Sequence, residues 1–422
     1  MIDDIAEEIL LRLPVKSLVR CKSLSKEWRE FISCNPAFRK RFIDRNRGCS
    51  FMLGFYLTHH MELVEYHHGE QVHFLPTYNN PAISVLSKRK TGNNNGVLDQ
   101  LLPKKRKREN DSALLLKKSP SFFSDPAVRV LGSSNGFLLC SLDAKCPLNY
   151  IIINPINKLC MSLPAASASS YFYTHGFICR SESPQLDTVD YYKVVRGISP
   201  EDWDTESFTM LEIISSDSSR WSQFYVKGQS PFYLDSLNPS KIIVSETGLV
   251  YVPGTLYKEQ EATDDGYNDN GVLIFDQSKQ NSVHVMELPP AENEVIHECF
   301  GQSDGLISYA RNDELGQLKI WRYNEQQGAG WSLVHNVSLE SWVDQLKHIR
   351  NASATKFCPE AFHPTDKNVI FLGADGKKMV YNLDKSKMDP YCDLKTQGWD
   401  GVYYFFPYTC GLIGPHLFLS QD

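Results

Sequence analysis

Apolar residues near the start of the chain recur at the three- and four-residue spacing of amphipathic helices. A first helix would carry its apolar side chains on one face, at Ile5, Ile9, Leu10 and Leu13. Pro14 would end that helix and suits the first turn of a second one, which would include Leu18 and Cys21. A third helix is expected from Ser25, with Trp28 on its apolar face. The pattern predicts a small all-α module of three helices, with too much apolar surface to bury without a partner.

From residue 46 onward the spacing changes to short apolar runs, many of them bounded by Asn-Gly, Asp-Gly or Thr-Gly turns. The expected strands are Phe51–Tyr56, Val128–Leu131, Phe137–Ser141, Tyr150–Asn154, Tyr191–Val195, Thr209–Ile214, Ile242–Ser245, Leu249–Val252, Val272–Asp276, Leu306–Ala310, Leu318–Tyr323, Val369–Leu372, Lys378–Asn382 and Leu417–Leu419. The chain is therefore predicted to be mainly β, with a helical module at residues 1–45 and a β domain at residues 46–422.

A weak repeat runs through the β domain. Each copy begins at a turn glycine and continues with an apolar strand, a second apolar strand ending in a polar residue, and a return strand; the glycines are Gly136, Gly248, Gly305 and Gly376. They are separated by 112, 57 and 71 residues, so one further copy is expected within the first interval. Radially repeated units of this length predict a β-propeller of about six to eight blades, with two or three separate β-sandwiches as the alternative.

The two ends of the β domain are expected to meet. Phe51–Tyr56 would pair with either Tyr403–Phe406 or Leu417–Leu419, so that strands from both ends of the chain close the ring of blades. This closure would also set the orientation of the propeller relative to a partner bound to the helical module.

Composition places further bounds on the protein. The chain has 422 residues and a net charge of −6, so it is not basic overall. Its eleven cysteines are scattered without a C-x-x-C pair, which favours reduced thiols over disulfides or a zinc site. No signal peptide and no membrane-spanning run are expected. These properties predict a protein of the nucleus and cytoplasm, with no cofactor, no membrane association and no specific nucleic-acid partner.

The segment at residues 86–119 differs from the rest, because it contains ten Lys or Arg residues against three Asp or Glu. Its composition predicts a disordered insertion in a blade loop. Five consecutive basic residues lie within it: Lys104, Lys105, Arg106, Lys107 and Arg108. Such a block resembles a nuclear import signal that an importin would bind, and a merely solvated loop is the alternative.

The helical module also carries a specific motif. Its residues Glu8-Ile9-Leu10-Leu11-Arg12-Leu13-Pro14-Val15-Lys16-Ser17-Leu18, followed by Lys26-Glu27-Trp28, resemble the F-box pattern almost throughout. The departures are a missing Leu-Pro pair at the start and Leu24 where Val is commoner. The resemblance implies docking on a Skp1-type adaptor, which would join the chain to a cullin–RING ubiquitin ligase.

On this interpretation one group of residues forms or supports the surface that the adaptor covers: Ile5, Ile9, Leu10, Leu13, Pro14, Leu18, Cys21 and Trp28. A few apolar anchors of this kind dominate the affinity of most protein interfaces. The alternative is an ordinary helical subdomain that packs on its own chain.

Three motifs in the β domain, Gly132–Cys140, Ile153–Lys158 and Asp190–Val195, resemble the divergent propeller that follows the F-box in a large family of plant proteins. The resemblance implies a non-catalytic substrate-recognition subunit of an SCF (Skp1–cullin–F-box) ligase, whose propeller binds an unknown target protein for ubiquitination. An F-box protein that uses its adaptor only for scaffolding has the same sequence features.

Patterns that could carry catalysis are weak. Gly132–Gly136 matches the G-x-S-x-G pattern of hydrolases, but a strand rather than a helix follows Ser134, so a hairpin turn is expected there. Five histidines lie close together without a fixed metal-ligand spacing: His59, His60, His67, His68 and His73. The alternative function is a β-propeller enzyme or carbohydrate-binding protein with a helical N-terminal cap.

Overall fold

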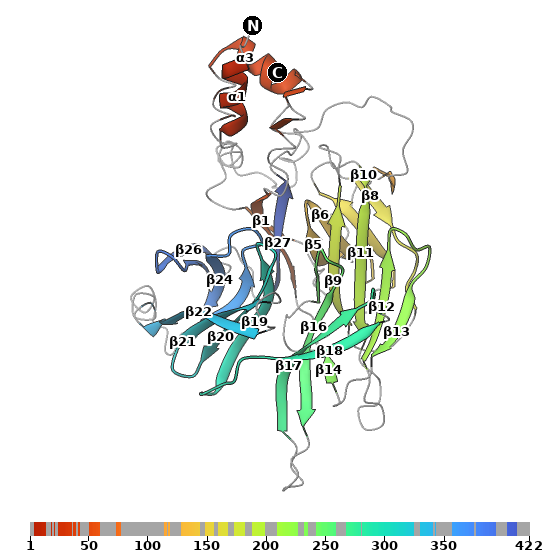
Figure 1. Ribbon diagram of the computed structural model, residues 1–422, viewed down its shortest axis with the longest axis vertical. Helices are drawn as coiled ribbons and strands as arrows, with labels where there is room; N and C mark the ends of the chain where they lie inside the picture. Colours follow the sequence, from red (N-terminus) through yellow and green to blue (C-terminus); the bar gives the residue numbers. More distant parts are fainter. Residues whose placement is uncertain are drawn as a thin grey trace.

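A helical module stands at one end of the molecule, above an array of β-sheets (Figure 1). The computed structural model describes residues 4–13, 18, 21, 24–35, 37–38, 41–42, 50–59, 73–76, 114–115, 117–118, 128–143, 148–155, 159–167, 173–181, 188–198, 209–226, 232–234, 242–258, 267–279, 281–324, 330–340, 342, 357–374, 377–393 and 403–411. The protein is mainly β, as predicted.

Two helices are described in the N-terminal module, α1 (Asp4–Arg12) and α3 (Lys26–Cys34). α1 ends two residues before Pro14, which cannot continue a helix. Ser25 is the N-cap of α3, because its hydroxyl accepts a hydrogen bond from the Trp28 amide at 3.2 Å. The expected middle helix falls mostly outside the described residues, so two of the three predicted helices are shown.

Five antiparallel sheets of four or five strands form the blades of a β-propeller (Figure 1). The first has the order β4 (Lys117–Lys118), β8 (Leu159–Ser162), β7 (Tyr150–Asn154), β6 (Phe137–Ser141) and β5 (Arg129–Ser134). The second has the order β13 (Ser222–Val226), β12 (Thr209–Ser215), β11 (Tyr191–Ile198) and β9 (Tyr173–Arg180). The third has the order β14 (Phe232–Leu234), β16 (Val250–Lys258), β17 (Tyr267–Asp276) and β18 (Ser282–Glu287), and β15 (Ile243–Val244) also pairs with β16.

The remaining two blades repeat the simple four-stranded order. The fourth blade consists of β19 (Val295–Ser303), β20 (Leu306–Asp313), β21 (Gln317–Asn324) and β22 (Gly330–Ser338). The fifth blade consists of β23 (Cys358–Phe362), β24 (Val369–Ala374), β25 (Lys377–Asn382) and β26 (Lys387–Asp393). In both blades, strands that follow one another in the chain are neighbours in the sheet.

A three-stranded sheet joins the two ends of the β domain, in the order β2 (His73–Pro76), β1 (Ser50–His59) and β27 (Tyr403–Gly411). Phe51 pairs with Cys410 and Tyr56 pairs with Phe406. The expected pairing of the first strand with Tyr403–Phe406 is therefore confirmed, whereas Leu417–Leu419 lies outside the described residues. A short pair of strands, β10 (Thr188–Val189) with β3 (Leu114–Leu115), completes the sheets that the structure describes.

The described chain has five full blades, so the expected number of six to eight is wrong. The additional copy expected between Gly136 and Gly248 is present as the second blade. Dividing the length of the β domain by the length of one repeat overestimates the number of blades for two reasons. Residues 77–127 contribute only β3 and β4 to the described sheets, and the first and last β-segments share one three-stranded sheet.

Two-residue turns connect the inner strands of the first and fourth blades. Asn135 and Gly136 have φ values of 46° and 87°, and Asp304 and Gly305 have φ values of 51° and 76°. Positive φ at both central positions defines the tight turn that suits a twisted hairpin, and Asn, Asp and Gly tolerate it best. The G-x-S-x-G sequence is therefore a hairpin turn, as predicted.

The apolar core lies between neighbouring blades rather than at the centre of any one sheet. On β11, Val194 packs into the cluster shared with the first blade, and Val195 packs into the cluster shared with the third. Further clusters join the third blade to the fourth and the fourth to the fifth. Because both faces of a blade are covered, every residue of β6, β7 and β24 is buried.

Candidate functional site

The helical module has an interior made by its own residues, which are Leu10, Leu11, Leu18, Ile32, Phe38 and Phe42. The ring centroid of Phe38 lies 5.1 Å from that of Phe31 and 6.0 Å from that of Phe42. The module therefore buries more apolar surface within this chain than its helical spacing alone suggested. Leu10 and Leu18, both predicted adaptor residues, lie in this interior and are fully buried.

Polar contacts fix the orientation of α1 on the residues that follow α3. Arg41 Nη1 lies 2.7 Å from Glu7 Oε1, and Arg41 Nη2 lies 3.0 Å from Glu8 Oε2. Asn35 Oδ1 accepts a hydrogen bond from the Phe38 amide at 3.1 Å, which starts the next helical turn. These contacts determine which face of α1 points away from the module.

Among the described residues of the module, two large apolar side chains are exposed. Ile9 on α1 is 54% exposed, and Leu24, just before the N-cap of α3, is 71% exposed. Isolated exposed apolar residues are ordinary on a protein surface, so the adaptor surface expected here stays a prediction. Helical spacing identified Ile9. It missed Leu24 because that residue lies in a turn between helices, where no periodicity marks it.

The other predicted adaptor residues take several positions. Leu13, Cys21 and Trp28 are partly buried and pack against the interior of the module. Ile5 lies in α1, but its side chain and the whole of Pro14 fall outside the described part of the chain. The basic block Lys104–Arg108 also lies outside the described residues. Of the histidine cluster, His59 and His73 lie on β1 and β2, which are neighbouring strands.

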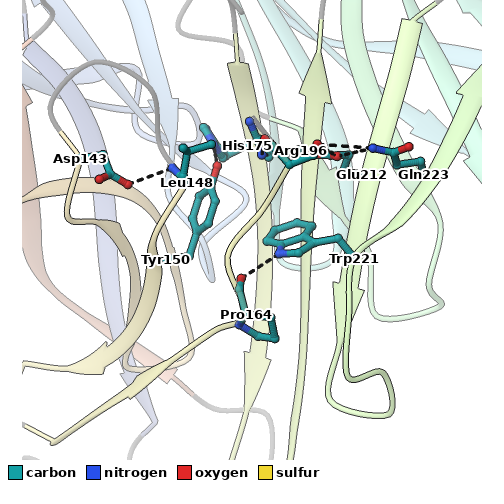
Figure 2. A network of polar contacts seen from close by, with 10 residues as sticks. Asp143, Leu148, Tyr150, Pro164, His175, Arg196, Glu212, Trp221 and Gln223 are labelled. Carbon is teal, nitrogen blue, oxygen red and sulfur yellow. Dashed lines mark hydrogen bonds and ion pairs between the residues drawn. The ribbon is translucent and has the colours of Figure 1, made fainter. Parts of the chain in front are cut away.

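Within the propeller, a buried ion pair links strands of the second blade. Arg196 Nη1 on β11 lies 2.9 Å from Glu212 Oε2 on β12, and both side chains are fully buried (Figure 2). Glu212 Oε1 accepts hydrogen bonds from Gln223 Nε2, at 2.9 Å, and from the Ser167 hydroxyl. Burying charge is costly unless it is paired and hydrogen-bonded, and this carboxylate meets both conditions.

His175 lies beside this pair and contacts the first blade. Its Nε2 is 3.0 Å from the hydroxyl oxygen of Tyr150 on β7 (Figure 2). Burial, followed by the positive charge of Arg196, lowers the pKa of His175 to about 3. The imidazole is therefore neutral at physiological pH, and its contact with Tyr150 joins the second blade to the first.

Arginines also bind the segments that connect one blade to the next. Arg196 Nη1 donates to the Ser167 carbonyl at 3.2 Å, in the segment after the first blade. Arg311 on β20 donates to the carbonyls of Pro289 and Pro290, at 2.8 and 2.7 Å, in the segment after the third blade. The second and fourth blades thus hold the preceding connection in the same way.

Two tryptophans near the outer strands also donate hydrogen bonds to carbonyl groups of the preceding blade or of the segment that follows it. The indole N–H of Trp221, next to β13, donates to the Pro164 carbonyl at 2.9 Å (Figure 2). That of Trp331 on β22 donates to the Glu287 carbonyl, also at 2.9 Å. These buried or half-buried polar groups bind other parts of the same chain, so the network is suited to joining blades rather than to transferring protons to a ligand.

Ser134 also joins two blades through hydrogen bonds. Its hydroxyl accepts a hydrogen bond from the Cys179 amide at 3.0 Å and lies 3.3 Å from the Cys179 carbonyl, to which Asn135 Nδ2 also donates at 2.9 Å.

Among the described residues, no group of three or more His, Cys, Asp or Glu side chains could hold a metal ion. Neither described helix is long and apolar enough to cross a membrane.

The helical module and the propeller together define a two-part, mainly β protein, and comparison with known families matches both parts. The F-box domain family matches residues 1–40. The family described as "F-box protein At3g26010-like, beta-propeller" matches residues 110–405. Because this second match spans more than half of the chain, the chain belongs to this family of F-box propeller proteins. F-box proteins are generally adaptors rather than enzymes.

Individual relatives are distant but similar over most of their length. F-box protein At5g07610 of Arabidopsis thaliana is 24% identical over 94% of this chain and 86% of its own. F-box protein At3g26010 of the same plant is 22% identical over 91% of this chain and 77% of its own. Among solved structures, a PL25 polysaccharide lyase, an ulvan lyase, has 10% identity and a TM-score of 0.36, covering 64% of this chain and 67% of that protein. A structural likeness at this level carries no conclusion about function.

Proposed function

We propose that this chain is the substrate-recognition subunit of an SCF-type E3 ubiquitin ligase. The F-box module would dock on a Skp1-type adaptor, which would connect the chain to a cullin. The propeller would hold a target protein near the ubiquitin-charged enzyme, so that transfer is accelerated by proximity without a catalytic residue from this chain. The observation that carries the proposal is the F-box match over residues 1–40, on a module whose first helix exposes Ile9.

The test of adaptor docking is the Ile9→Glu substitution in the full chain. A charge at the centre of an apolar contact removes an interface anchor, for which losses of about 2 kcal/mol or more, roughly 30-fold in affinity, are typical. The side chain is 54% exposed, so the module should stay folded. Binding to a purified Skp1-type adaptor is measured by titration calorimetry.

Leu315→Glu is the matched control, because Leu315 is 55% exposed but lies in the turn between β20 and β21 of the propeller. This variant should bind the adaptor like the unaltered chain. Failure of the unaltered chain to bind any Skp1-type adaptor, or equal binding by Ile9→Glu, would contradict the proposed function.

We also propose that Lys104–Arg108 is a nuclear import signal, and that the protein occupies both nucleus and cytoplasm. Five adjacent positive charges suit the acidic groove of an import receptor. Replacing all five with Ala in a fluorescently tagged chain should lower the nuclear share of the fluorescence. Replacing Lys88, Arg89 and Lys90 in the same segment should leave that share unchanged. An unaltered distribution in the first variant would remove this assignment.

A separate experiment distinguishes degradation from scaffolding. Partners are captured with the full chain from cells with and without proteasome inhibition. A bound protein that accumulates only with the inhibitor supports ubiquitin-dependent turnover. A bound protein whose amount does not change supports scaffolding.

A further inference from the structure

The second and third blades meet beside the turn at residues 245–248, which two cationic side chains of the second blade reach. Arg180 is the last residue of β9, and its Nη2 donates to the Glu246 carbonyl at 3.3 Å. Lys193 on β11 donates from Nζ to the Gly248 carbonyl at 3.4 Å. Lys193 lies two residues along β11 from the residue opposite Arg180, so the two side chains leave the sheet on the same face.

Each of these cations keeps unused hydrogen-bond donors. Nε of Arg180 is buried and has no hydrogen-bond partner among the described residues. Lys193 is only 6% exposed, yet in the described part of the chain its ammonium makes one long hydrogen bond and no ion pair. An ammonium has three donors, and burying a charged group without partners is costly. Burial accordingly lowers the pKa of Lys193. Both cations therefore have donors left for an acceptor from outside the chain.

Two carboxylates face Lys193 without forming an ion pair with it. Asp217 and Asp276 raise the pKa of Lys193 and so oppose the larger effect of burial. Both carboxylates are held by other residues, because Asp217 accepts a hydrogen bond from the Ser215 hydroxyl and Asp276 Oδ2 lies 3.4 Å from Lys279 Nζ. The ammonium of Lys193 is thus near negative charge but is not directly satisfied by it.

Glu246 shows how a carboxylate is held beside these cations. Its Oε2 lies 3.5 Å from Arg180 Nη2, and the two side chains are 73% and 42% exposed. An exposed ion pair at this distance contributes little to stability, so another carboxylate can replace that of Glu246 at low cost. The exposed part of Arg180 makes the site reachable from solvent, and Lys193 provides a second, more deeply buried donor.

We propose that Arg180 and Lys193 form a binding site for one carboxylate of the target protein, an Asp or Glu side chain that replaces Glu246 and also accepts a hydrogen bond from Lys193. A group with a single negative charge fits best, because Asp217 and Asp276 already face Lys193 and would repel a phosphate more strongly. Charge-assisted hydrogen bonds from two cations would supply both affinity and orientation. The inference rests on the proposed function, since the acidic side chain would belong to the target protein.

The test begins with selection of short random peptides, displayed on phage, on the immobilised full chain. The selected peptides should share an Asp or Glu at one position. One of them is then synthesised in three forms, with the acidic residue, with the corresponding amide and with phosphoserine at that position. Affinities are measured by fluorescence anisotropy at constant ionic strength, because salt screens exposed charges. The amide form should bind about tenfold more weakly or worse, and the phosphoserine form should not exceed the carboxylate form.

Variants of the chain test each side of the site. Arg180→Gln and Lys193→Met should each weaken binding of the acidic peptide by about tenfold or more and leave binding of the amide peptide unchanged. Arg180 is 42% exposed, so Arg180→Gln maintains the test should Lys193→Met fail to fold. Glu246→Gln should strengthen binding of the acidic peptide, because it removes the competing carboxylate. A purely structural role of the two cations would not produce this gain.

Lys279→Gln is the matched control, since it removes one positive charge from the same region. Lys279 is 77% exposed and pairs with Asp276, so this variant should bind the acidic peptide like the unaltered chain. Several results would each overturn the proposal: selected peptides without a shared acidic position, unchanged affinity in Arg180→Gln, no gain in Glu246→Gln, tighter binding of the phosphoserine form, or a library that yields no binder.

The outcome can be separated from that of the proposed function. Ile9→Glu should abolish adaptor binding and leave peptide affinity unchanged, whereas Arg180→Gln should do the reverse. A chain that binds the adaptor but selects no acidic peptide retains the proposed function and loses this carboxylate site.

Discussion

Arg196 and Glu212 place two opposite charges in a region from which water is excluded. Each partner makes the burial of the other tolerable, and Gln223 satisfies a further lone pair of the carboxylate. Sequence reasoning missed this pair, because each residue appears only as a charged position within a mainly apolar strand. Only the register of β11 against β12, with Arg196 opposite Glu212, brings the two together.

Replacing Glu212 with Gln should destabilise the propeller by about 3–5 kcal/mol, because it leaves the Arg196 charge buried without a counter-charge. The measurement is the midpoint of urea-induced unfolding, monitored by tryptophan fluorescence. The exposed pair of Lys387 with Asp389 is the control, and Asp389→Asn should leave the midpoint nearly unchanged. The double variant Arg196→Met, Glu212→Leu should recover much of the loss. A Glu212→Gln midpoint equal to that of the unaltered chain would show that the pair contributes nothing.

His175 predicts how stability depends on acidity. Its pKa is about 3 in the folded chain against an ordinary value of 6.5, so between these pH values the unfolded chain binds a proton that the folded chain does not. The contribution of His175 to the free energy of unfolding is therefore fully present above pH 6.5. As the pH falls from 6.5 toward 3, this contribution decreases by up to about 1.4 kcal/mol per pH unit.

The substitution His175→Gln should make the acid-side decline of the unfolding midpoint shallower. Among the described residues, Tyr150 and Arg196 lie against His175. His335 and His363, whose pKa values are also lowered by burial, should maintain part of the decline in the variant. Parallel pH profiles for the two proteins would contradict the prediction.

At the scale of elements, the sequence identified strands best where both faces are buried. β6 and β7 have the bounds that their apolar runs predicted. Outer strands such as β13, β18 and β22 were missed, because they expose one side and mix polar with apolar residues. Inner strands such as β9 and β19 were missed for another reason. They include glycine where neighbouring blades approach closely, which interrupts the apolar run.

The glycine of β9 provides a test of this close approach. A Cβ atom on Gly176 would lie 2.6 Å from Ile242 Cγ2 and 2.9 Å from the Ile242 carbonyl, so neither neighbour could remain in place. Gly176→Ala should destabilise the propeller by about 1–3 kcal/mol, the usual range for overpacking. Gly330→Ala is the control, because a Cβ there meets nothing within 4 Å. Equal thermal midpoints for the two variants would contradict this explanation.

At the scale of the whole molecule, β1 and β27 join parts of the chain that are far apart in sequence. β27 also packs beside β5 of the first blade and β23 of the fifth, so it links the last blade back to the first. Phe406 on β27 is buried in the cluster of the first and second blades. The sheet therefore connects the first blade with the fifth.

Removing β27 should open this unit. A chain truncated after residue 402 leaves β1 paired with β2 alone and exposes the cluster into which Phe406 packs. We expect it to unfold at lower temperature and to be cut faster by proteases within the first and fifth blades. A chain truncated after residue 411, which retains β27, is the control. Identical thermal midpoints for the two truncated chains would show that β27 does not hold the propeller closed.

The amino-acid sequence by itself determined the helical module with its F-box pattern, the β character of the remaining chain and the hairpin turns. These features depend on residue spacing and turn chemistry, which are local and can be read position by position. Only the tertiary structure decided that there are five full blades, that Leu24 is exposed while Leu10 and Leu18 are buried, and that Arg196 meets Glu212. Each of these depends on which distant segments pack together, because burial and strand register are properties of the assembled sheets.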